Sequence, residues 1–291
     1  MTQSEMHGKI CLVTGASSGI GKATATALAK QGATVVMICR DQRKGEAARS
    51  EIQESSGNAS IALLLADLSS QASIHQLAQQ CQAIYPQIHV LINNAGVALT
   101  RRSVTVDGIE TTFAVNVLAP FLLSHLLLAS LKAGASSRII NVASSIQRSL
   151  DFADLQQEKR YSGWQMYGQT KSALILLTYE FAKRLQGTGV TVNCLHPGFI
   201  ATDLGRSASP VTRLLQRLFA SSPEKGAATS IHLASSPEVE GITGKFFVKS
   251  QEARSSQETY DEAASLRLWD ICVQLTGASA FLPADENIQN Q

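Results

Sequence analysis

The feature that most constrains the fold of this chain is a regular alternation of short apolar runs with longer segments of helical character. The short runs are rich in Val, Ile and Leu, which is typical of strands buried on both faces of a sheet. We expect strands at 9–14, 34–39, 60–66, 88–93, 138–143, 190–195 and 245–248, and helices at 22–30, 42–55, 71–84, 108–131 and 164–185. This alternation predicts an α/β fold with a parallel sheet covered by helices on both faces.

The size and charge of the chain restrict its class further. With 291 residues, 44% of them hydrophobic, it can bury a full core; no linker or repeat divides it, so we predict one domain over 1–283 and a flexible tail at 284–291. Residues 201–222 form a stretch that is too long for an ordinary loop. The 25 basic and 23 acidic residues leave a net charge of +2 without a block of like charge, which gives no reason to expect nucleic acid as a partner.

The cysteines and the apolar segments bear on the compartment. Five scattered cysteines without a C-x-x-C pair favour neither disulfides nor a metal site, so we expect no metal and a reduced, cytoplasmic compartment. The first residues lack the apolar core of a signal peptide, and the most apolar stretch, 117–131, is shorter than the roughly 20 residues that a membrane span needs. We therefore expect no transmembrane segment and interpret 117–131 as a buried or interface helix.

A glycine-rich turn lies between the first expected strand and the first expected helix. Gly15, Gly19 and Gly21 permit a tight turn that brings backbone N–H groups at a helix N-terminus up to a pyrophosphate. An ordinary strand-to-helix turn is the alternative, because the spacing is not G-x-G-x-x-G. For a bound dinucleotide, we expect contacts from Gly15, Ser17, Ser18, Gly19, Ile20 and Gly21.

The residue that ends the second expected strand predicts which dinucleotide fits. An Asp or Glu there would hydrogen-bond a ribose 2′-hydroxyl, but the chain has Arg40, with Arg43 and Lys44 close behind. A guanidinium suits a 2′-phosphate, so we predict NADP(H) rather than NAD(H). Asp41 makes the local charge less one-sided, and a solvated cluster at a helix start is the alternative.

Polar and small residues follow the third and fourth expected strands. Asp67, with Leu68 beside it, is placed to accept a hydrogen bond from an adenine amino group, although Asp is also common at helix N-caps. The small residues of Asn94-Ala95-Gly96 let the chain pass close to a cofactor, although such residues also form polar turns. Because ligands bind at the carboxyl ends of parallel strands, we expect both groups in the cofactor site.

Tyr167 and Lys171 lie one helical turn apart at the start of a long apolar segment, and Ser144 precedes them. A cation close to a phenol favours the phenolate and lowers the tyrosine pKa from about 10. Such a tyrosine can donate or accept a proton at working pH. By itself the pair also has an ordinary explanation, since solvated Tyr and Lys four residues apart are common on helices.

Taken together, these motifs resemble those of one enzyme family. They are Thr14-Gly15-x-x-x-Gly19-Ile-Gly21, Asn93-Asn94-Ala95-Gly96, Asn116, Ser144, Tyr167-x-x-x-Lys171 and Pro197-Gly198, in this order. Their order and separations resemble the short-chain dehydrogenase/reductase family over essentially the whole chain. The resemblance implies a Rossmann-type, doubly wound parallel sheet of seven strands with NAD(P) bound across it. A closer likeness, in segments such as 154–161 and 183–190, is to the retinol dehydrogenase and retinal reductase branch.

The resemblance also implies roles for individual residues. Tyr167 would exchange a proton with the substrate oxygen, while Lys171 would lower the tyrosine pKa and hold the nicotinamide ribose. Ser144, which takes the family's place in preference to its neighbour Ser145, would hydrogen-bond the carbonyl oxygen. Asn116 would hold a water that links Lys171 to solvent. Contacts on the nicotinamide side would come from Pro197, Gly198, Ile200 and Thr202.

The substrate side is expected to be apolar. Leu214 and Leu218 belong to an apolar stripe at helical spacing within 201–222, with Arg213 and Arg217 on the other side. We interpret 201–222 as an amphipathic lid over the substrate; contact of its cationic side with a membrane surface and simple packing on the domain are the alternatives. The candidate pocket walls are Trp164, Phe199, Leu214 and Leu218.

These observations lead to one main functional hypothesis: NADPH-dependent, reversible reduction of a lipophilic aldehyde, with retinal as the named candidate. One alternative is a broad-specificity carbonyl reductase for small aldehydes or ketones. Another is a non-catalytic NADP-binding sensor or partner protein on the same scaffold, which the intact Ser, Tyr, Lys and Asn argue against. Because members of the family often assemble through their long central helices, we also expect a homodimer through 117–131.

Overall fold

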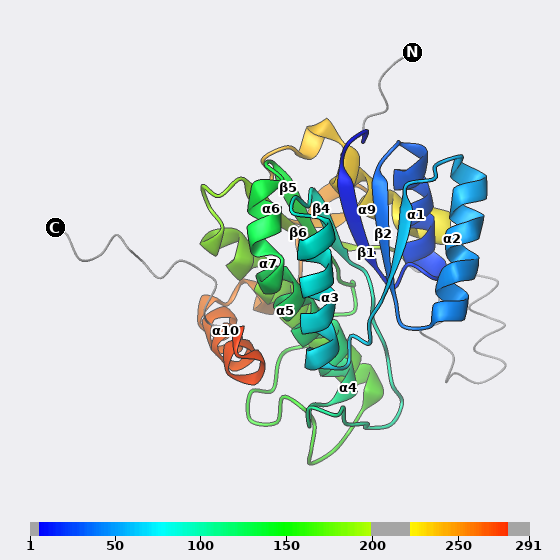
Figure 1. Ribbon diagram of the computed structural model, residues 1–291. Helices are drawn as coiled ribbons and strands as arrows, with labels where there is room; N and C mark the ends of the chain where they lie inside the picture. Colours follow the sequence, from blue (N-terminus) through cyan, green and yellow to red (C-terminus); the bar gives the residue numbers. More distant parts are fainter. Residues whose placement is uncertain (1–5, 199–221, 279–291) are drawn as a thin grey trace.

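The computed structural model describes residues 6–198 and 222–278, which contain one sheet of eight strands (Figure 1). The strands are β1 (Ile10–Thr14), β2 (Thr34–Cys39), β3 (Ile61–Leu65), β4 (Val90–Asn93), β5 (Ser137–Val142), β6 (Val190–His196), β7 (Phe246–Val248) and β8 (Gln251–Ala253). They lie in the order β3-β2-β1-β4-β5-β6-β7-β8. β1 to β7 are parallel, and β8 pairs antiparallel with β7. The expected Rossmann-type sheet of seven strands is confirmed, with one hairpin strand added.

Helices cover both faces of the sheet (Figure 1). On one face lie α1 (Gly19–Lys30), α2 (Gln42–Ser56) and α9 (Pro223–Ser235), and on the other lie α3 (Gln71–Ile84), α5 (Ala119–Leu126), α6 (Leu128–Ala133), α7 (Gly163–Arg184) and α10 (Glu262–Thr276). Successive strand residues point to opposite faces. Leu12 therefore packs in the cluster with α3, α5 and α7, whereas Val13 packs in the cluster with α1, α2 and α9. Both faces are apolar, which explains why the strands have continuous apolar sequences.

The sheet topology fixes where a ligand can bind. The chain runs outward from β1 through β2 to β3, then crosses back to β4 on the other side of β1. The strand order reverses between β1 and β4, and a crevice opens outside the carboxyl ends of strands at such a point. The glycine turn that follows β1 and the Asn94–Gly96 segment that follows β4 therefore lie on the two sides of this crevice.

The continuous helix expected over 108–131 is wrong, because the structure divides it into several parts. A short helix α4 (Thr111–Phe113) leads into a π turn (Ala114–Leu118), and α5 and α6 follow. The Glu110 carboxylate caps α4 by accepting the Phe113 N–H at 2.7 Å. In the π turn, the Asn116 side chain bonds both backbone groups of Val97. This partner lies outside the helix, so the local sequence does not reveal the irregular turn.

The sequence analysis does not predict β8, α9 or α10. β8 is polar and its first two residues are exposed; it is held by pairing with β7 and by a Lys245–Glu252 ion pair of 2.7 Å. Helix α9 buries mostly small residues, such as Gly226 and Ala227, which give little apolar signal. The expected lid at 201–222, apart from residue 222, and the tail at 284–291 lie outside the described residues and stay predictions.

The apolar stretch 117–131 is buried within the chain itself. Phe121 and His125 of α5 pack against Phe181 of α7 and Trp269 of α10, with ring centroids 4.2 to 5.6 Å apart. Burial lowers the pKa of His125 to about 4, so this ring is neutral within the cluster. The segment's apolar character is thus explained without a second copy of the chain, and the homodimer stays a prediction.

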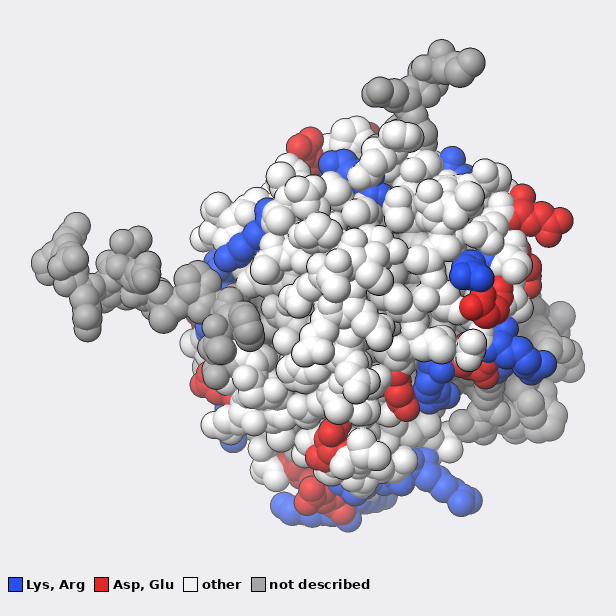
Figure 2. Space-filling view, in the orientation of Figure 1, with Lys and Arg blue, Asp and Glu red and all other residues white. Residues whose placement is uncertain are grey.

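Three further observations concern membrane spans, surface charge and the cysteines. Among the described residues, no helix is both long and apolar enough to cross a membrane. On the face shown in Figure 2, acidic and basic side chains are interspersed rather than gathered by sign. All five cysteines are free thiols and are buried: Cys11, Cys39, Cys81, Cys194 and Cys272.

Candidate active site

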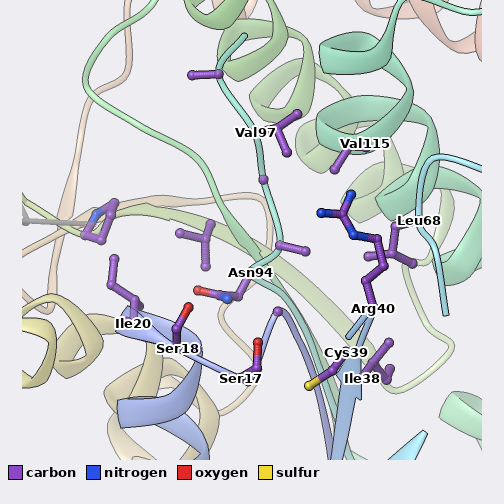
Figure 3. Close-up of a pocket in the computed structure, with 18 of the residues that line it drawn as sticks. Ser17, Ser18, Ile20, Ile38, Cys39, Arg40, Leu68, Asn94, Val97 and Val115 are labelled. Atoms are coloured by element: carbon purple, nitrogen blue, oxygen red, sulfur yellow. The ribbon is translucent and has the colours of Figure 1, made fainter. Parts of the chain in front are cut away.

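The glycine turn after β1 forms the floor of a cavity of about 490 Å³ (Figure 3). Gly15 and Gly19 have φ angles of +68° and +55°, in the left-handed region that favours glycine. A Cβ on Gly21 would lie 2.4 Å from the Gly15 carbonyl oxygen and 2.5 Å from Asn94 Nδ2. Both distances are shorter than a non-bonded contact of a Cβ atom allows, so this position requires glycine. Ser18 is the N-cap of α1, yet its side chain makes no capping hydrogen bond. The turn is therefore compact and leaves the N-terminus of α1 available to an anion.

Thr14, at the end of β1, ties this turn to the segment after β4. Its hydroxyl oxygen accepts the N–H groups of Asn94 and Ala95, both at 2.9 Å, and donates to the Ile92 carbonyl at 3.3 Å. The Asn94 side chain returns a bond from Nδ2 to the Thr14 carbonyl at 2.8 Å. Thr14 is 1% exposed, whereas Asn94 and Ala95 are partly exposed, so the Thr14 side of these bonds is shielded from water. They hold the two sides of the crevice at a fixed separation.

The end of the cavity beside β2 contains both charges and an apolar wall. Arg40 extends from the end of β2 into the cavity near Leu68, as Figure 3 shows, and Lys44 also lines it. Asp41 caps α2 by accepting the Lys44 N–H at 2.9 Å, and this bond lowers the pKa of its carboxyl group. Asp67 lines the same region and accepts bonds from the Ser69 N–H and hydroxyl at 3.0 and 2.7 Å.

Tyr167 and Lys171 lie at the other end of the cavity, on the first turns of α7. The Lys171 ammonium is 5.6 Å from the centroid of the Tyr167 ring and donates to the Val142 carbonyl at 2.8 Å. Burial lowers the pKa of Lys171 to about 8. Helix α7 begins at this place because Ser162 caps it, and Gly163 lets its first turn approach the Leu99 carbonyl.

The structure corrects the expected pKa of Tyr167. Burial raises it, and a hydrogen bond with Ser144 lowers it by less. The reason is geometric: the Lys171 ammonium lies over the ring and is bonded to a carbonyl, so in this arrangement it does not offset the desolvation of the phenolate. Ser144 is 5% exposed, whereas Ser145 is exposed. Of the two serines, Ser144 is thus the one that contacts Tyr167.

Asn116 connects the π turn to the cavity wall. Its Oδ1 accepts the Val97 N–H at 2.8 Å, and its Nδ2 donates to the Val97 carbonyl at 2.9 Å and to Thr170 Oγ1 at 3.1 Å. Both amide hydrogens are in use, so a water held by this residue would bind at one of its oxygens. A Cβ on Gly96 would be 3.3 Å from Asn116 Oδ1 and 3.6 Å from Lys171 Nζ, which shows how closely these groups approach.

Comparison with known proteins identifies the family. The sequence profile described as short chain dehydrogenase matches residues 9–212. The chain belongs to the short-chain dehydrogenase family. This dehydrogenase is 41% identical to retinol dehydrogenase 12 of Mus musculus over 281 residues, which cover 95% of this chain and 89% of the relative. It is also 41% identical to human retinol dehydrogenase 14, over 94% of this chain and 87% of the relative.

Solved structures share the fold of this chain. A protein from Mycobacterium paratuberculosis superposes with a TM-score of 0.78 at 29% identity, and the match covers 96% of each chain. RhlG of Pseudomonas aeruginosa, solved as a complex with NADP in its active site, superposes with a TM-score of 0.70 at 29% identity, over 85% of this chain and 97% of that one. This chain is therefore an oxidoreductase of the short-chain dehydrogenase family that acts on CH–OH groups, a family that uses NAD(P)(H).

The cavity of this dehydrogenase fits a nicotinamide dinucleotide. A glycine cradle without room for a Cβ, an available helix N-terminus and cationic side chains suit the phosphates, and the Leu68 end suits a purine. The predicted contacts that line it are Gly15, Ser17, Ser18, Gly19, Ile20, Gly21, Arg40, Asp67, Leu68, Asn94, Ala95, Gly96, Tyr167, Lys171 and Pro197. Gly198, with a φ of +91°, is described but does not line it.

Other predicted site residues lie elsewhere. Trp164 is 60% exposed on the first turn of α7 and does not line the described cavity. Phe199, Ile200, Thr202, Leu214 and Leu218 lie outside the described residues. The sequence analysis missed the apolar wall formed by Val97, Ala98, Leu99, Val115, Val142 and Ala143. Most of these residues end or follow β4 and β5, and Val115 lies in the π turn, so the rule that ligands bind at the carboxyl ends of strands could have found most of them.

Proposed function

We propose that this protein is an NADPH-dependent reductase that converts a lipophilic aldehyde, retinal-like in size and polarity, to the alcohol, and that it also catalyses the reverse reaction. The main support is the arrangement of one cavity, with Arg40 and Lys44 at one end and Tyr167 and Lys171 at the other. The relatives named retinol dehydrogenases support the substrate class.

The proposed chemistry divides between cofactor and protein. When bound, the nicotinamide supplies or accepts the hydride. Tyr167 donates its hydroxyl proton to the substrate carbonyl oxygen and recovers it in the reverse direction. Ser144 hydrogen-bonds the same oxygen and stabilises its developing negative charge. Because its pKa is about 8, Lys171 can release or take up a proton near neutral pH. A water held by Asn116 would link it to solvent.

The preference for NADPH rests on the charge at the end of β2. Two cations, Arg40 and Lys44, face the cavity there, and the carboxylate of Asp41 is engaged as a helix cap. A guanidinium binds a 2′-phosphate through charge-assisted hydrogen bonds, roughly twice as strong as neutral ones. Fluorescence titration with NADPH and NADH tests this. Arg40→Ala is expected to weaken NADPH binding at least tenfold and leave NADH binding within about twofold; an unchanged preference would refute the assignment.

The substrate class is tested by measuring NADPH consumption with a panel of aldehydes of increasing length, from short aliphatic chains to retinal. The apolar wall of Val97, Leu99 and Val115 favours long chains, so kcat/KM is expected to rise with chain length. A rate that is independent of length would instead favour a broad carbonyl reductase.

The proton-transfer role of Tyr167 is tested with Tyr167→Phe, which keeps the ring and removes the hydroxyl. We expect NADPH binding to be retained and kcat to fall by a factor of about 10² to 10⁴, because general acid catalysis contributes rate factors of this size. Aldehyde reduction at a near wild-type rate would contradict the mechanism.

A further inference from the structure

The turn that contains Ser144 is held by three hydrogen bonds that the proposed mechanism does not use. Ser144 Oγ accepts the Ile146 N–H at 3.0 Å, which occupies one lone pair of the hydroxyl. Two bonds from Gln147 then enclose the turn: its Nε2 donates to the Ser144 carbonyl at 3.0 Å, and its Oε1 accepts the Ser256 N–H at 2.6 Å. Gln147 therefore bridges the Ser144 turn and the segment that follows β8.

The chemistry of the amide fixes the direction of this bridge. A carbonyl oxygen can only accept a hydrogen bond and a backbone N–H can only donate one. The Gln147 side chain must therefore place its NH₂ toward Ser144 and its oxygen toward Ser256. A shorter or purely donating side chain could not satisfy both partners at once.

The Ser256 end of the bridge is anchored on the helix that also contains Tyr167. Ser255 Oγ lies 2.8 Å from the Tyr179 hydroxyl and 2.6 Å from Thr259 Oγ1. Thr259, which is 1% exposed, donates through Oγ1 to the Ser256 carbonyl at 2.7 Å. Tyr179 belongs to α7, so the Ser256 N–H has a fixed position relative to Tyr167 on the same helix.

We propose that Gln147 is a positioning residue, which sets the Ser144 hydroxyl relative to Tyr167 through the Ser256 N–H. This inference rests on the proposed role of Ser144. The bridge fixes the Ser144 backbone, and the Ile146 N–H fixes the orientation of Oγ, so the hydroxyl hydrogen is directed to the tyrosine or to the substrate oxygen. The C-terminal part of the chain thereby acts on the reaction without touching substrate or cofactor.

Position 256 permits a selective test of the bridge. Its φ angle is −63°, which a proline ring adopts, and its own Oγ is buried without a hydrogen-bond partner. Ser256→Pro removes the N–H that Gln147 accepts, whereas Ser256→Ala keeps it. We expect kcat to fall about tenfold in Ser256→Pro, since a lost hydrogen bond corresponds to a factor of this order, and to stay within about twofold of wild type in Ser256→Ala.

Gln147→Ala provides the second variant, with the exposed Gln165→Ala as a matched control near Tyr167. In the wild-type background, Gln147→Ala is expected to lower kcat about tenfold at unchanged Kd for NADPH. In a Ser144→Ala background, the same substitution is expected to have no further effect, because the hydroxyl it positions is absent. A merely structural role would give the same loss in both backgrounds.

Two results would overturn the proposal: a tenfold loss from Gln147→Ala that persists in the Ser144→Ala background, or wild-type kcat in both Gln147→Ala and Ser256→Pro. Failure of the proposed function would appear differently. It would be seen in the wild-type protein as an absence of NADPH-dependent aldehyde reduction, whereas failure of the Gln147 proposal appears as a ratio between variants of an active enzyme.

Discussion

The Thr14 hydroxyl can be removed with little change in shape, and the cost can be worked from its three hydrogen bonds. Thr14→Val replaces the hydroxyl by a methyl group, so the N–H groups of Asn94 and Ala95 lose an acceptor and the Ile92 carbonyl loses a donor. A buried donor left without a partner costs about 1–3 kcal/mol. The Asn94 N–H keeps a second acceptor, the Ile92 carbonyl at 3.0 Å, so only the Ala95 N–H is left without a protein partner. Because Ala95 is partly exposed and water can satisfy it in part, we expect a total loss of about 1–3 kcal/mol.

The loss is measured from urea unfolding curves of the wild type, Thr14→Val and Thr14→Ser. With an m value of about 3 kcal/mol/M, the midpoint of Thr14→Val should fall by about 0.3–1 M. Thr14→Ser keeps the hydroxyl and loses only a methyl group, which corresponds to about 1 kcal/mol. Because the 94–96 segment lines the cofactor cavity, the Kd for NADPH should also rise in Thr14→Val and stay close to wild type in Thr14→Ser.

A specific result would refute this reasoning. If the free energy of unfolding of Thr14→Val were within about 0.5 kcal/mol of the wild-type value, the three bonds would contribute nothing net to stability. If NADPH binding were also unchanged, Thr14 would not be what holds the two sides of the crevice together.

Three further predictions concern charge, close approach and packing. Burial lowers the pKa of Lys171 from the ordinary value of 10.5 to about 8, so the folded state loses this proton at a lower pH than the unfolded state does. Between pH 8 and 10.5, the free energy of unfolding of the wild type relative to Lys171→Met should therefore rise with pH, by up to about 3 kcal/mol. A difference in urea midpoints that does not change with pH would contradict a buried ammonium. Gly21→Ala places a Cβ 2.4 Å from the Gly15 carbonyl oxygen, so the turn must move. The NADPH affinity of this variant, measured by fluorescence titration, should fall at least tenfold. Wild-type affinity would show that the turn tolerates a side chain. Trp269→Ala empties the aromatic cluster under α10 and should lower the free energy of unfolding by about 3–5 kcal/mol, whereas a loss below about 1 kcal/mol would show that α10 is not part of the core.

The sequence predicts the sheet well because the parallel strands consist of short apolar runs. The expected boundaries of the second strand, 34–39, are those of β2, and the third, 60–66, differs from β3 by one residue at each end. Burial on both faces favours apolar side chains at most positions of a central strand such as β2, so its apolar run is interpretable by itself. The polar β8 has no such pattern and depends on pairing with β7.

The part of the site that could be predicted from the sequence is the part whose geometry depends on residues close together in the chain. Gly15 and Gly19 adopt the left-handed backbone that the turn requires, and they precede or begin the first helix, so their spacing in the sequence predicts the turn. The break in the helix at Asn116 depends instead on Val97, and the exposure of Trp164 depends on how α7 meets its neighbours. Such partners lie far apart in the sequence and are brought together only by the fold.

The pKa of Tyr167 shows the same limit for electrostatics. Spacing predicts that Lys171 lies near the phenol, and it does, but the direction of the pKa shift depends on burial and on where the ammonium is bonded. Local sequence contains neither quantity.

Because all five cysteines are buried, their reaction with a thiol reagent reports when the protein unfolds locally or globally. Burial raises the pKa of Cys11 and Cys81 to about 12 and that of Cys39 to about 11, so almost no thiolate is present near neutral pH. A maleimide should therefore add to the native enzyme very slowly, and unfolded molecules should gain five adducts, countable by mass spectrometry. Cys39 also forms part of the cavity wall, so a single early adduct there, suppressed by NADPH, would distinguish local opening beside β2 from global unfolding.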